Sequence, residues 1–276
     1  MGSIAVVIVT HNSAIFISKL LATLEAQTLS PDLVVFVDSG SSDTGYLDCA
    51  RKSFLRCTVI LKQNIGFAVG CNTGWHLSKD YDFVLFLNPD AFLTPDFLKR
   101  AVEYMETYSN RNVGMLTGTL LGYDVKADRP TGLVDSTCVM HTWYGQSIDR
   151  DQRAPISILK KYVQPNSVPA ICGAALLARQ ATLQDIAEGD ILFDPGYFMY
   201  KEDIDLSWKA VRSGWILIHH PGLIAYHCRG WKGRRESSRR MRLLSARNDV
   251  KLFVRFRSPY VIYAILKYAL VWSFNI

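Results

Sequence analysis

The chain has 276 residues and is 49% hydrophobic, which is enough for one full-sized core or two small domains. Its six cysteines form no CxxC pair and no regular spacing, so neither a disulfide framework nor a zinc site is expected, and a reducing cytoplasm is the default. The positive charge is concentrated in residues 229–257, which contain nine Arg and two Lys but only two acidic residues. This segment has a net charge of +9, so the rest of the chain has −3 of the total of +6. This basic segment favours phosphate, acidic lipid or nucleic acid as a partner.

The N-terminal residues lead into an apolar run, Ile4–Thr10, with no charged region or cleavage site before it. We therefore expect a first strand rather than a signal peptide. Further runs of this kind lie at 33–38, 58–62, 83–88 and 113–121. They are almost continuously apolar, which is typical of strands buried on both faces.

Helical patterns lie between these strands. One follows Asn12 and Ser13, which are good N-cap residues, and another covers 97–108. A third covers 203–213 and ends at Gly214, before a strand at 216–220. The alternation predicts an α/β fold with an open parallel sheet, helices on both faces, and a ligand beyond the carboxyl ends of the strands.

Two regions depart from this alternation. Residues 122–169 contain scattered Gly, Pro, Asp and Arg and are predicted to form loops, one of which closes over substrate. The last eighteen residues, 259–276, are mostly apolar with Lys267 in the middle, at the short edge for a spanning helix. Because the basic segment precedes them, an interfacial helix fits best, while a helix packed on the domain and a truncated spanning helix stay open.

Polar side chains end two of the predicted strands. Asp38 ends the second strand, and Asn88 and Asp90 follow the fourth. Acidic groups at the carboxyl ends of neighbouring parallel strands point into one crevice, where Mg²⁺ or Mn²⁺ finds oxygen ligands. The alternative is that Asp and Asn only begin turns.

A glycine-rich stretch, 64–74, follows the third strand and includes Asn64, Gly66 and Gly70. Small residues let the backbone approach a ligand, and a helix beginning near Gly70 would offer its N-terminal amides. The stretch is not GxGxxG, and no such motif follows the first strand, which argues against a dinucleotide-binding dehydrogenase.

The last cluster consists of acids and a histidine. Glu202, Asp203 and Asp205 lie at a predicted helix start, where acids often serve only as caps. The local positive potential predicts a low pKa for Asp203, which would stay ionised and accept a proton from a hydroxyl group. His227 has the residue type to complete a metal site begun by Asp90, although a lone His is usually structural.

Together these segments resemble glycosyltransferase family 2, and within it the rhamnosyltransferase-like branch. The resemblance covers about residues 3–250, and His227 lies 24 residues beyond Asp203, as a family metal-binding His would. The matching motifs are VIVTHN at 7–12, VDSGSSD at 37–43, NIGFAVGCNTG at 64–74, LNPD at 87–90, CGAA at 172–175 and FMYKEDIDL at 198–206.

The resemblance implies a GT-A fold with a mostly parallel sheet and a C-terminal helical extension. It divides the chain into a catalytic domain at 1–228, with a nucleotide-binding half at about 1–120 and an acceptor half at about 121–228, and a tail at 229–276. The implied site residues are Asp203 as catalytic base beside Glu202, Asp90 and His227 as ligands of Mn²⁺ or Mg²⁺, and Thr10, Asn12, Asp38, Asn64, Gly66 and Asn88 for the nucleotide sugar. Two departures are Asn88, where the wider family has Asp, and Trp231, where relatives often have Ser.

The same resemblance implies an inverting transfer, by in-line displacement, of L-rhamnose from dTDP-L-rhamnose to a polysaccharide or a polyprenyl-diphosphate-linked glycan. The expected place is the inner face of a bacterial plasma membrane, with 229–276 on the lipid surface and no nucleic acid bound. UDP-hexose and UDP-galactofuranose are the alternative donors. Three other functions are disfavoured: a nucleotidyltransferase, which needs a Gly-rich basic loop after the first strand; a catalytically dead sugar-binding relative; and a non-catalytic phosphate- or nucleic-acid-binding protein, since no nucleic-acid module is recognisable.

Overall fold

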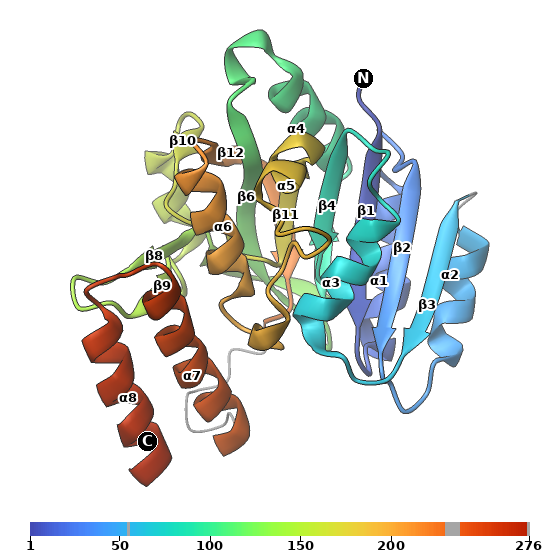
Figure 1. The fold of residues 1–276 in the computed structure, drawn as a ribbon. Coiled ribbons are helices and arrows are strands. Elements are labelled where there is room, and N and C mark those ends of the chain that lie inside the picture. The colour runs from blue at the N-terminus through green and yellow to red at the C-terminus, as the bar shows by residue number, and fades with distance from the viewer. Residues whose placement is uncertain (54–55, 230–237, 275–276) are drawn as a thin grey trace.

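The computed structural model of the chain describes residues 1–53, 56–229 and 238–274 (Figure 1). The N-terminal part alternates strands and helices as the hydrophobic pattern predicts. Its elements are β1 (Ile4–Thr10), α1 (Ala14–Glu25), β2 (Leu33–Ser39), η1 (Gly45–Leu47), α2 (Asp48–Ser53), β3 (Cys57–Lys62), α3 (Gly66–His76), β4 (Phe83–Leu87), β5 (Ala91–Leu93), α4 (Phe97–Glu106) and η2 (Tyr108–Asn110).

The remaining part is richer in strands than the sequence suggested. Its elements are β6 (Val113–Asp124), β7 (Arg129–Ser136), β8 (Val139–His141), β9 (Ser147–Asp149), η3 (Ile156–Lys161), β10 (Asn166–Ser167), β11 (Ala175–Arg179), α5 (Gln180–Ile186), η4 (Pro195–Tyr197), α6 (Glu202–Arg212), β12 (Ile216–His227), α7 (Arg239–Arg255) and α8 (Val261–Phe274). The prediction of loops over 122–169 is thus wrong for much of that region. Short, partly exposed strands such as β8 and β9 lack the continuous apolar run that marks β1.

Ten strands form one sheet, with β10-β12-β6-β11-β4-β1-β2-β3 in order, β5 against β12 and β7 against β6. The pairs β1–β2, β1–β4 and β2–β3 are parallel, as predicted. However, β11 lies antiparallel between β4 and β6, where the alternation of strands and helices predicted an open parallel sheet, so the sheet is mixed at this point. Ala175–Leu177 of β11 are buried, and an apolar run of this kind carries no signal for strand direction.

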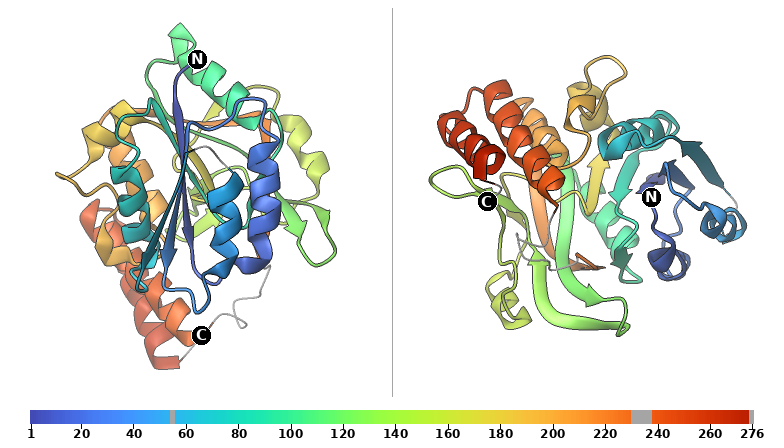
Figure 2. Two further views of the ribbon diagram at one scale, coloured as in Figure 1. Left: turned by 90° about the vertical axis from the view of Figure 1, so that its right-hand side faces the viewer. Right: turned by 90° about the horizontal axis from the view of Figure 1, so that it is seen from below.

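Helices cover both faces of the sheet, and β1 shows why. Ile4, Val6 and Ile8 face one core, which contains α1 and α4, while Val7 and Val9 face a second core with α3 and α5. Figure 2 shows α1 and α3 on opposite sides of the first strands. With both faces covered, every residue of β1 is buried, which explains its unbroken apolar run.

The glycines of α3 serve packing. A Cβ on Gly70 would lie 2.7 Å from Val9 Cγ1, and one on Gly74 would lie 2.2 Å from Val7 Cγ1. The helix begins at Gly66 rather than near Gly70, and the amides of Phe67 and Ala68 at its start donate to the carbonyl of Phe198. The prediction that this helix start offers free amides to a ligand is therefore wrong.

Two helices begin without a side-chain cap, one of them the helix for which Asn12 and Ser13 were predicted as N-cap residues. Ser13 occupies the N-cap position of α1, and Asp96 that of α4, but neither side chain makes a capping hydrogen bond. The Ser13 hydroxyl instead accepts from the backbone amide of His11 at 3.2 Å. The hydrophobic face of each helix, rather than its cap, fixes its place on the sheet.

The C-terminal helices α7 and α8 lie side by side below the sheet (Figure 1). Ser238 caps α7 by accepting from Met241 N at 3.3 Å, and α8 buries Ala264 and Val271. Among the described residues, no helix has both the length and the apolar character needed to cross a bilayer. Trp231 and the rest of 230–237, part of the predicted basic tail, lie outside the described residues.

Candidate active site

Asp90 and His227 are brought together by the pairing of two strands. Asp90 immediately precedes β5, and His227 ends β12, where it pairs with Ala91 in antiparallel register. The backbone amide of Cys228 donates to Asp90 O at 2.9 Å. As a result, His227 Nε2 lies 3.3 Å from Asp90 Oδ1, which places the two predicted metal ligands side by side.

A second carboxylate holds the other side of the imidazole. Asp135, on β7, is fully buried, and its Oδ2 lies 2.8 Å from His227 Nδ1. Arg229 Nε lies 3.2 Å from the other oxygen of Asp135, and the same guanidinium pairs with Asp149. A hydrogen bond between one ring nitrogen and a carboxylate fixes the orientation of the imidazole, and with it the direction in which the opposite nitrogen points.

The charges of this cluster depend on one another. Burial alone would lower the pKa of His227, but the carboxylates of Asp90 and Asp135 outweigh it and raise the pKa to about 9. Burial would likewise raise the pKa of Asp90, but the neighbouring imidazolium lowers it. At neutral pH the side chains thus form an imidazolium–carboxylate pair.

The donor set of this pair fits a divalent cation. One carboxylate oxygen and one imidazole nitrogen are ligands that Mn²⁺ accepts, and Mg²⁺ is held by one or two carboxylates, with water and phosphate completing the shell. Across 1–53, 56–229 and 238–274, no three or more His, Cys, Asp and Glu side chains form a ready-made metal cluster. A cation here would therefore take its remaining ligands from water and a bound phosphate.

Asp203 faces the same cavity, of about 590 Å³, which Asn88, Asp90 and His227 also line. It lies in the first turn of α6, and its carboxylate accepts the backbone amides of Gly173 and Ile204, both at 2.9 Å. Asp90, Asp203 and His227, distant in the sequence, thus converge on one cavity.

The pKa values of the acidic pair correct one expectation. Burial raises the pKa of Asp203, although the Gly173 amide, Lys201 and the Ile204 amide lower it in part. The prediction of a low pKa at a helix N-terminus is therefore wrong, because desolvation outweighs the helix potential. Burial and the charge of Asp203 also raise the pKa of Glu202 to about 8, so this carboxyl is mostly protonated at neutral pH.

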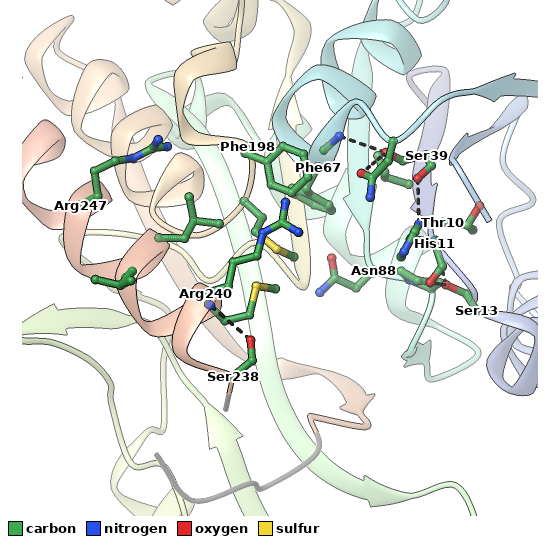
Figure 3. A pocket seen from close by; sticks show the side chains of 18 of the residues that line it. Thr10, His11, Ser13, Ser39, Phe67, Asn88, Phe198, Ser238, Arg240 and Arg247 are labelled. Atoms are coloured by element: carbon green, nitrogen blue, oxygen red, sulfur yellow. Dashed lines mark hydrogen bonds between the residues drawn. The ribbon is translucent and has the colours of Figure 1, made fainter. Parts of the chain in front are cut away.

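A larger cavity, of about 860 Å³, adjoins the first, since Phe67, Asn88 and Met199 line both. Figure 3 shows Thr10 and Asn88 at the carboxyl ends of β1 and β4, with Arg240 and Arg247 of α7 across the cavity. Asn64 and Gly66 also line its wall. Four of the six predicted nucleotide-sugar residues thus lie on this cavity: Thr10, Asn64, Gly66 and Asn88.

The other two, Asn12 and Asp38, do not line either cavity. Asp38 is 1% exposed and accepts hydrogen bonds from Thr10 Oγ1 at 3.0 Å and Tyr46 OH at 2.9 Å. Burial would raise the pKa of Asp38, but the donors of Ser41, Tyr46 and Thr10 lower it. Asn12 Oδ1 accepts from the backbone amide of Ser42 at 2.9 Å, so both side chains hold the loop after β2.

The turn before Asp203 has an unusual backbone. Phe198, Tyr200 and Lys201 have φ values of 62°, 71° and 74°, in the left-handed region that L side chains rarely adopt. At Phe198 ψ is −60°, and Met199 N donates to Tyr197 O at 2.7 Å, which makes the rare γ-turn with positive φ. Each such residue costs about 1–3 kcal/mol and persists only where its surroundings hold it.

Sequence reasoning missed two acids of the site, Asp135 and Asp149. Asp149 lines the smaller cavity, and Asp135 stands behind His227. Both lie in 122–169, which was predicted as loops. No motif marks Asp135, and only the pairing of β7 with β6 brings it to the site.

The fold is that of the GT-A glycosyltransferases, as superposition on solved structures shows. GalNAc-T7 with UDP, GalNAc and Mn²⁺ aligns at a TM-score of 0.68 and 18% identity over 92% of this chain, which spans 48% of that one. The mannosyltransferase PcManGT from Pyrobaculum calidifontis, with GDP-Man and Mn²⁺, aligns at 0.63 and 18% identity, covering 99% and 71% of the two chains.

The sequence places the protein within this class. The profile of glycosyl transferase family 2 matches residues 5–182, more than half of the chain, and the protein belongs to that family. An N-acetylglucosaminyl-diphospho-decaprenol L-rhamnosyltransferase of Mycobacterium tuberculosis is 23% identical over 80% of this chain and 75% of its own. The rhamnosyltransferase WbbL of Escherichia coli is 26% identical over 80% and 82%. The predicted fold, family and glycosyltransferase class are confirmed.

Proposed function

We propose that this glycosyltransferase transfers L-rhamnose from dTDP-L-rhamnose to a lipid-linked or cell-surface glycan, with inversion at the anomeric carbon. The observation that carries the proposal is the convergence of Asp90, Asp203 and His227 on one cavity that adjoins a larger one. The larger cavity would hold the nucleotide, and the smaller one the reacting sugar and the acceptor hydroxyl.

The walls of the larger cavity suit a nucleoside diphosphate. Thr10, Asn64 and Asn88 supply polar groups at the sheet edge, and Arg240 and Arg247 supply positive charge from α7. Arginine side chains bind phosphate oxygens in a bidentate manner. Asp38 and Asn12 would act indirectly, by holding the loop that borders this space.

Asp90 and His227 would hold Mn²⁺ or Mg²⁺. When bound, the cation neutralises negative charge that develops on the leaving diphosphate. Asp135 keeps the His227 ring in place through Nδ1, and Arg229 in turn neutralises Asp135. The chain supplies few ligands of its own, which suits a cation that arrives with the donor.

Asp203 would be the general base that accepts the proton of the attacking hydroxyl. Its raised pKa increases its proton affinity, and the two backbone amides fix its carboxylate. Glu202, mostly protonated at neutral pH, adds little charge beside it. Direct displacement needs only this one base, and it inverts the anomeric configuration.

The choice of donor rests on the relatives, two of which are named as rhamnosyltransferases. The M. tuberculosis relative is named for a diphospho-decaprenol acceptor, which supports a lipid-linked acceptor here. In a thermal-shift panel with Mn²⁺, we expect dTDP-L-rhamnose to raise Tm more than UDP-glucose, UDP-galactofuranose or GDP-mannose, because a ligand that binds the folded state stabilises it. A larger shift with a UDP-sugar would replace rhamnose by that sugar and leave the transferase assignment intact.

We also propose that α8 docks on the inner face of a bacterial plasma membrane. Ile262, Ile265 and Leu266 are 69%, 51% and 60% exposed, and Trp272, at the same helical face, is 62% exposed. Arg239, at the basic start of α7, donates a hydrogen bond to the backbone carbonyl of Trp272 at 2.8 Å. Apolar side chains next to basic ones are typical of a helix in the interface of an anionic bilayer.

The double change Ile265→Glu/Trp272→Glu tests this docking. Because each buried large side chain contributes about 1.5–3 kcal/mol, we expect at least about a tenfold loss of binding to phosphatidylglycerol vesicles in a sedimentation assay. Val163→Glu, at an 83% exposed site outside the tail, is the control for added charge and should bind as the wild type does. Equal binding of the double variant and the wild type would exclude α8 as the contact.

A further inference from the structure

The backbone that leads into α6 cannot hold its conformation by itself. Phe198, Tyr200 and Lys201 combine positive φ values with large side chains, directly before Glu202 and Asp203. An L residue in this region relaxes unless hydrogen bonds from elsewhere keep it there. The question is which groups supply them.

The carbonyl groups of this turn are bonded from outside it. Phe198 O accepts from the amides of Phe67 and Ala68 at 2.6 and 3.2 Å. The other three carbonyls converge on one side chain of α7, since Asn248 Nδ2 lies 2.9 Å from the oxygens of Tyr197, Met199 and Tyr200. Four consecutive carbonyls, 197–200, are thus held by α3 and α7.

Asn248 is fully buried, and its orientation is defined by its neighbours. The three carbonyls can only accept, so they require the NH₂ group, while Arg247, a pure donor, approaches Asn248 Oδ1 at 3.3 Å. The NH₂ group has two hydrogens for three carbonyl oxygens, so at least one hydrogen is shared, and removal of the amide takes both donors away from the turn. Its contacts are therefore specific to an amide rather than to side-chain size.

The next residue adds a second link. Asp249 is 1% exposed and lies 3.3 Å from Lys201 Nζ, at the residue that precedes α6. Its other oxygen pairs with Lys267 of α8. This buried carboxylate, paired with two lysines, links the turn, α7 and α8. Loss of either lysine would leave its buried charge less well balanced, which is costly.

We propose that Asn248 and Asp249 are positioning residues for the transfer reaction, so that α7 acts on the site through these two side chains rather than serving only as a membrane attachment. The inference rests on the proposed role of Asp203, two residues beyond Lys201. Asn248 sets the direction in which α6 starts, and thereby the distance of the Asp203 carboxylate from the acceptor hydroxyl. Neither residue lines either cavity.

Asn248→Asp tests the proposal, because it keeps the shape, removes both amide hydrogens and sets a carboxyl group against three carbonyl oxygens. With dTDP-L-rhamnose and Mn²⁺ we expect kcat to fall by about 10²-fold, as misplacement of a catalytic group by about 1 Å does, while the KM for the donor changes little. Hydrogen–deuterium exchange of amides 197–203 should rise. Asn248→Ala, which removes the donors without adding charge, is the second variant in case Asn248→Asp does not fold.

Leu252→Ala is the matched control, since Leu252 is buried on the same helix but cannot hydrogen-bond the turn. It should lower Tm without accelerating exchange at 197–203 or reducing kcat per folded molecule. Unchanged exchange in both Asn248 variants, or equal losses of kcat in Leu252→Ala and Asn248→Asp, would overturn the proposal. Asp203→Asn in the same assay separates the two ideas: if it retains turnover, the base assignment fails, whereas exchange still reports on the role of Asn248.

Discussion

Asp203→Asn is expected to lower kcat by about 10²–10⁴-fold, the usual contribution of a general base, while the enzyme still binds the donor. The asparagine side chain keeps the shape of aspartate, and its oxygen can still accept a hydrogen bond from one of the two backbone amides that hold Asp203. It cannot accept a proton at neutral pH. Release of the nucleoside diphosphate measures turnover, and calorimetric titration with the nucleotide and Mn²⁺ measures binding. Retained turnover would remove Asp203 from the base role.

The pH profile gives the same hypothesis a second check. The base must be ionised, so kcat/KM should fall as the pH falls through the pKa of Asp203, and burial raises that pKa above the usual range of an Asp. The acidic limb should therefore lie at a higher pH than an exposed carboxylate would give. Asp190→Asn, the same change at a side chain that is 80% exposed, is the control and should alter neither limb.

Asp90→Ala is expected to abolish metal-dependent nucleotide binding. Asp90 supplies the carboxylate of the proposed site, which has two protein ligands, and loss of even an indirect metal partner commonly costs about 10–100-fold in affinity. Titration of dTDP in the presence of Mn²⁺ and then of EDTA measures the effect. Asp80→Ala changes an exposed acid before β4, at the opposite end of the strand, and should retain the response to metal. Wild-type activity that is insensitive to EDTA would contradict the metal hypothesis.

Metal affinity should also depend on pH, through His227. Its pKa of about 9 means that a proton occupies the ring at neutral pH, and a cation must displace that proton to bind Nε2. Apparent affinity should therefore rise with pH, by up to about tenfold per unit, until the pH exceeds the pKa of the free enzyme. His227→Gln should flatten this dependence.

The elements predicted well from sequence are those whose pattern reflects burial. Ile4–Thr10 was predicted residue for residue because both faces of β1 are covered. The same pattern does not indicate whether a strand runs parallel or antiparallel to its neighbours, so the antiparallel placement of β11 could not be predicted. Gly70 illustrates a different limit. A residue without a side chain allows close approach of a ligand or of a neighbouring strand equally well, and here Val9 of β1 approaches it.

The candidate site divides in a similar way. Asp90 and Asp203 lie in recognisable motifs and His227 lies at a recognisable spacing from them. The structure brings all three to one cavity. Asp135 and Asn248 have no such mark, because each derives its importance from partners far away in the sequence. Within Arg247-Asn248-Asp249 the pattern is that of a solvated basic helix, whereas Asn248 and Asp249 are buried.

The position of β11 has a mechanical consequence for the whole enzyme. This strand is bonded to β4 on one side and to β6 on the other, so it joins the side of the sheet that carries β1 to the side that carries β12. A swing of one half against the other would have to break that ladder, and packed cores do not deform gradually. Product escape must then depend on the loops and helices around the rim, which can move without disturbing this frame.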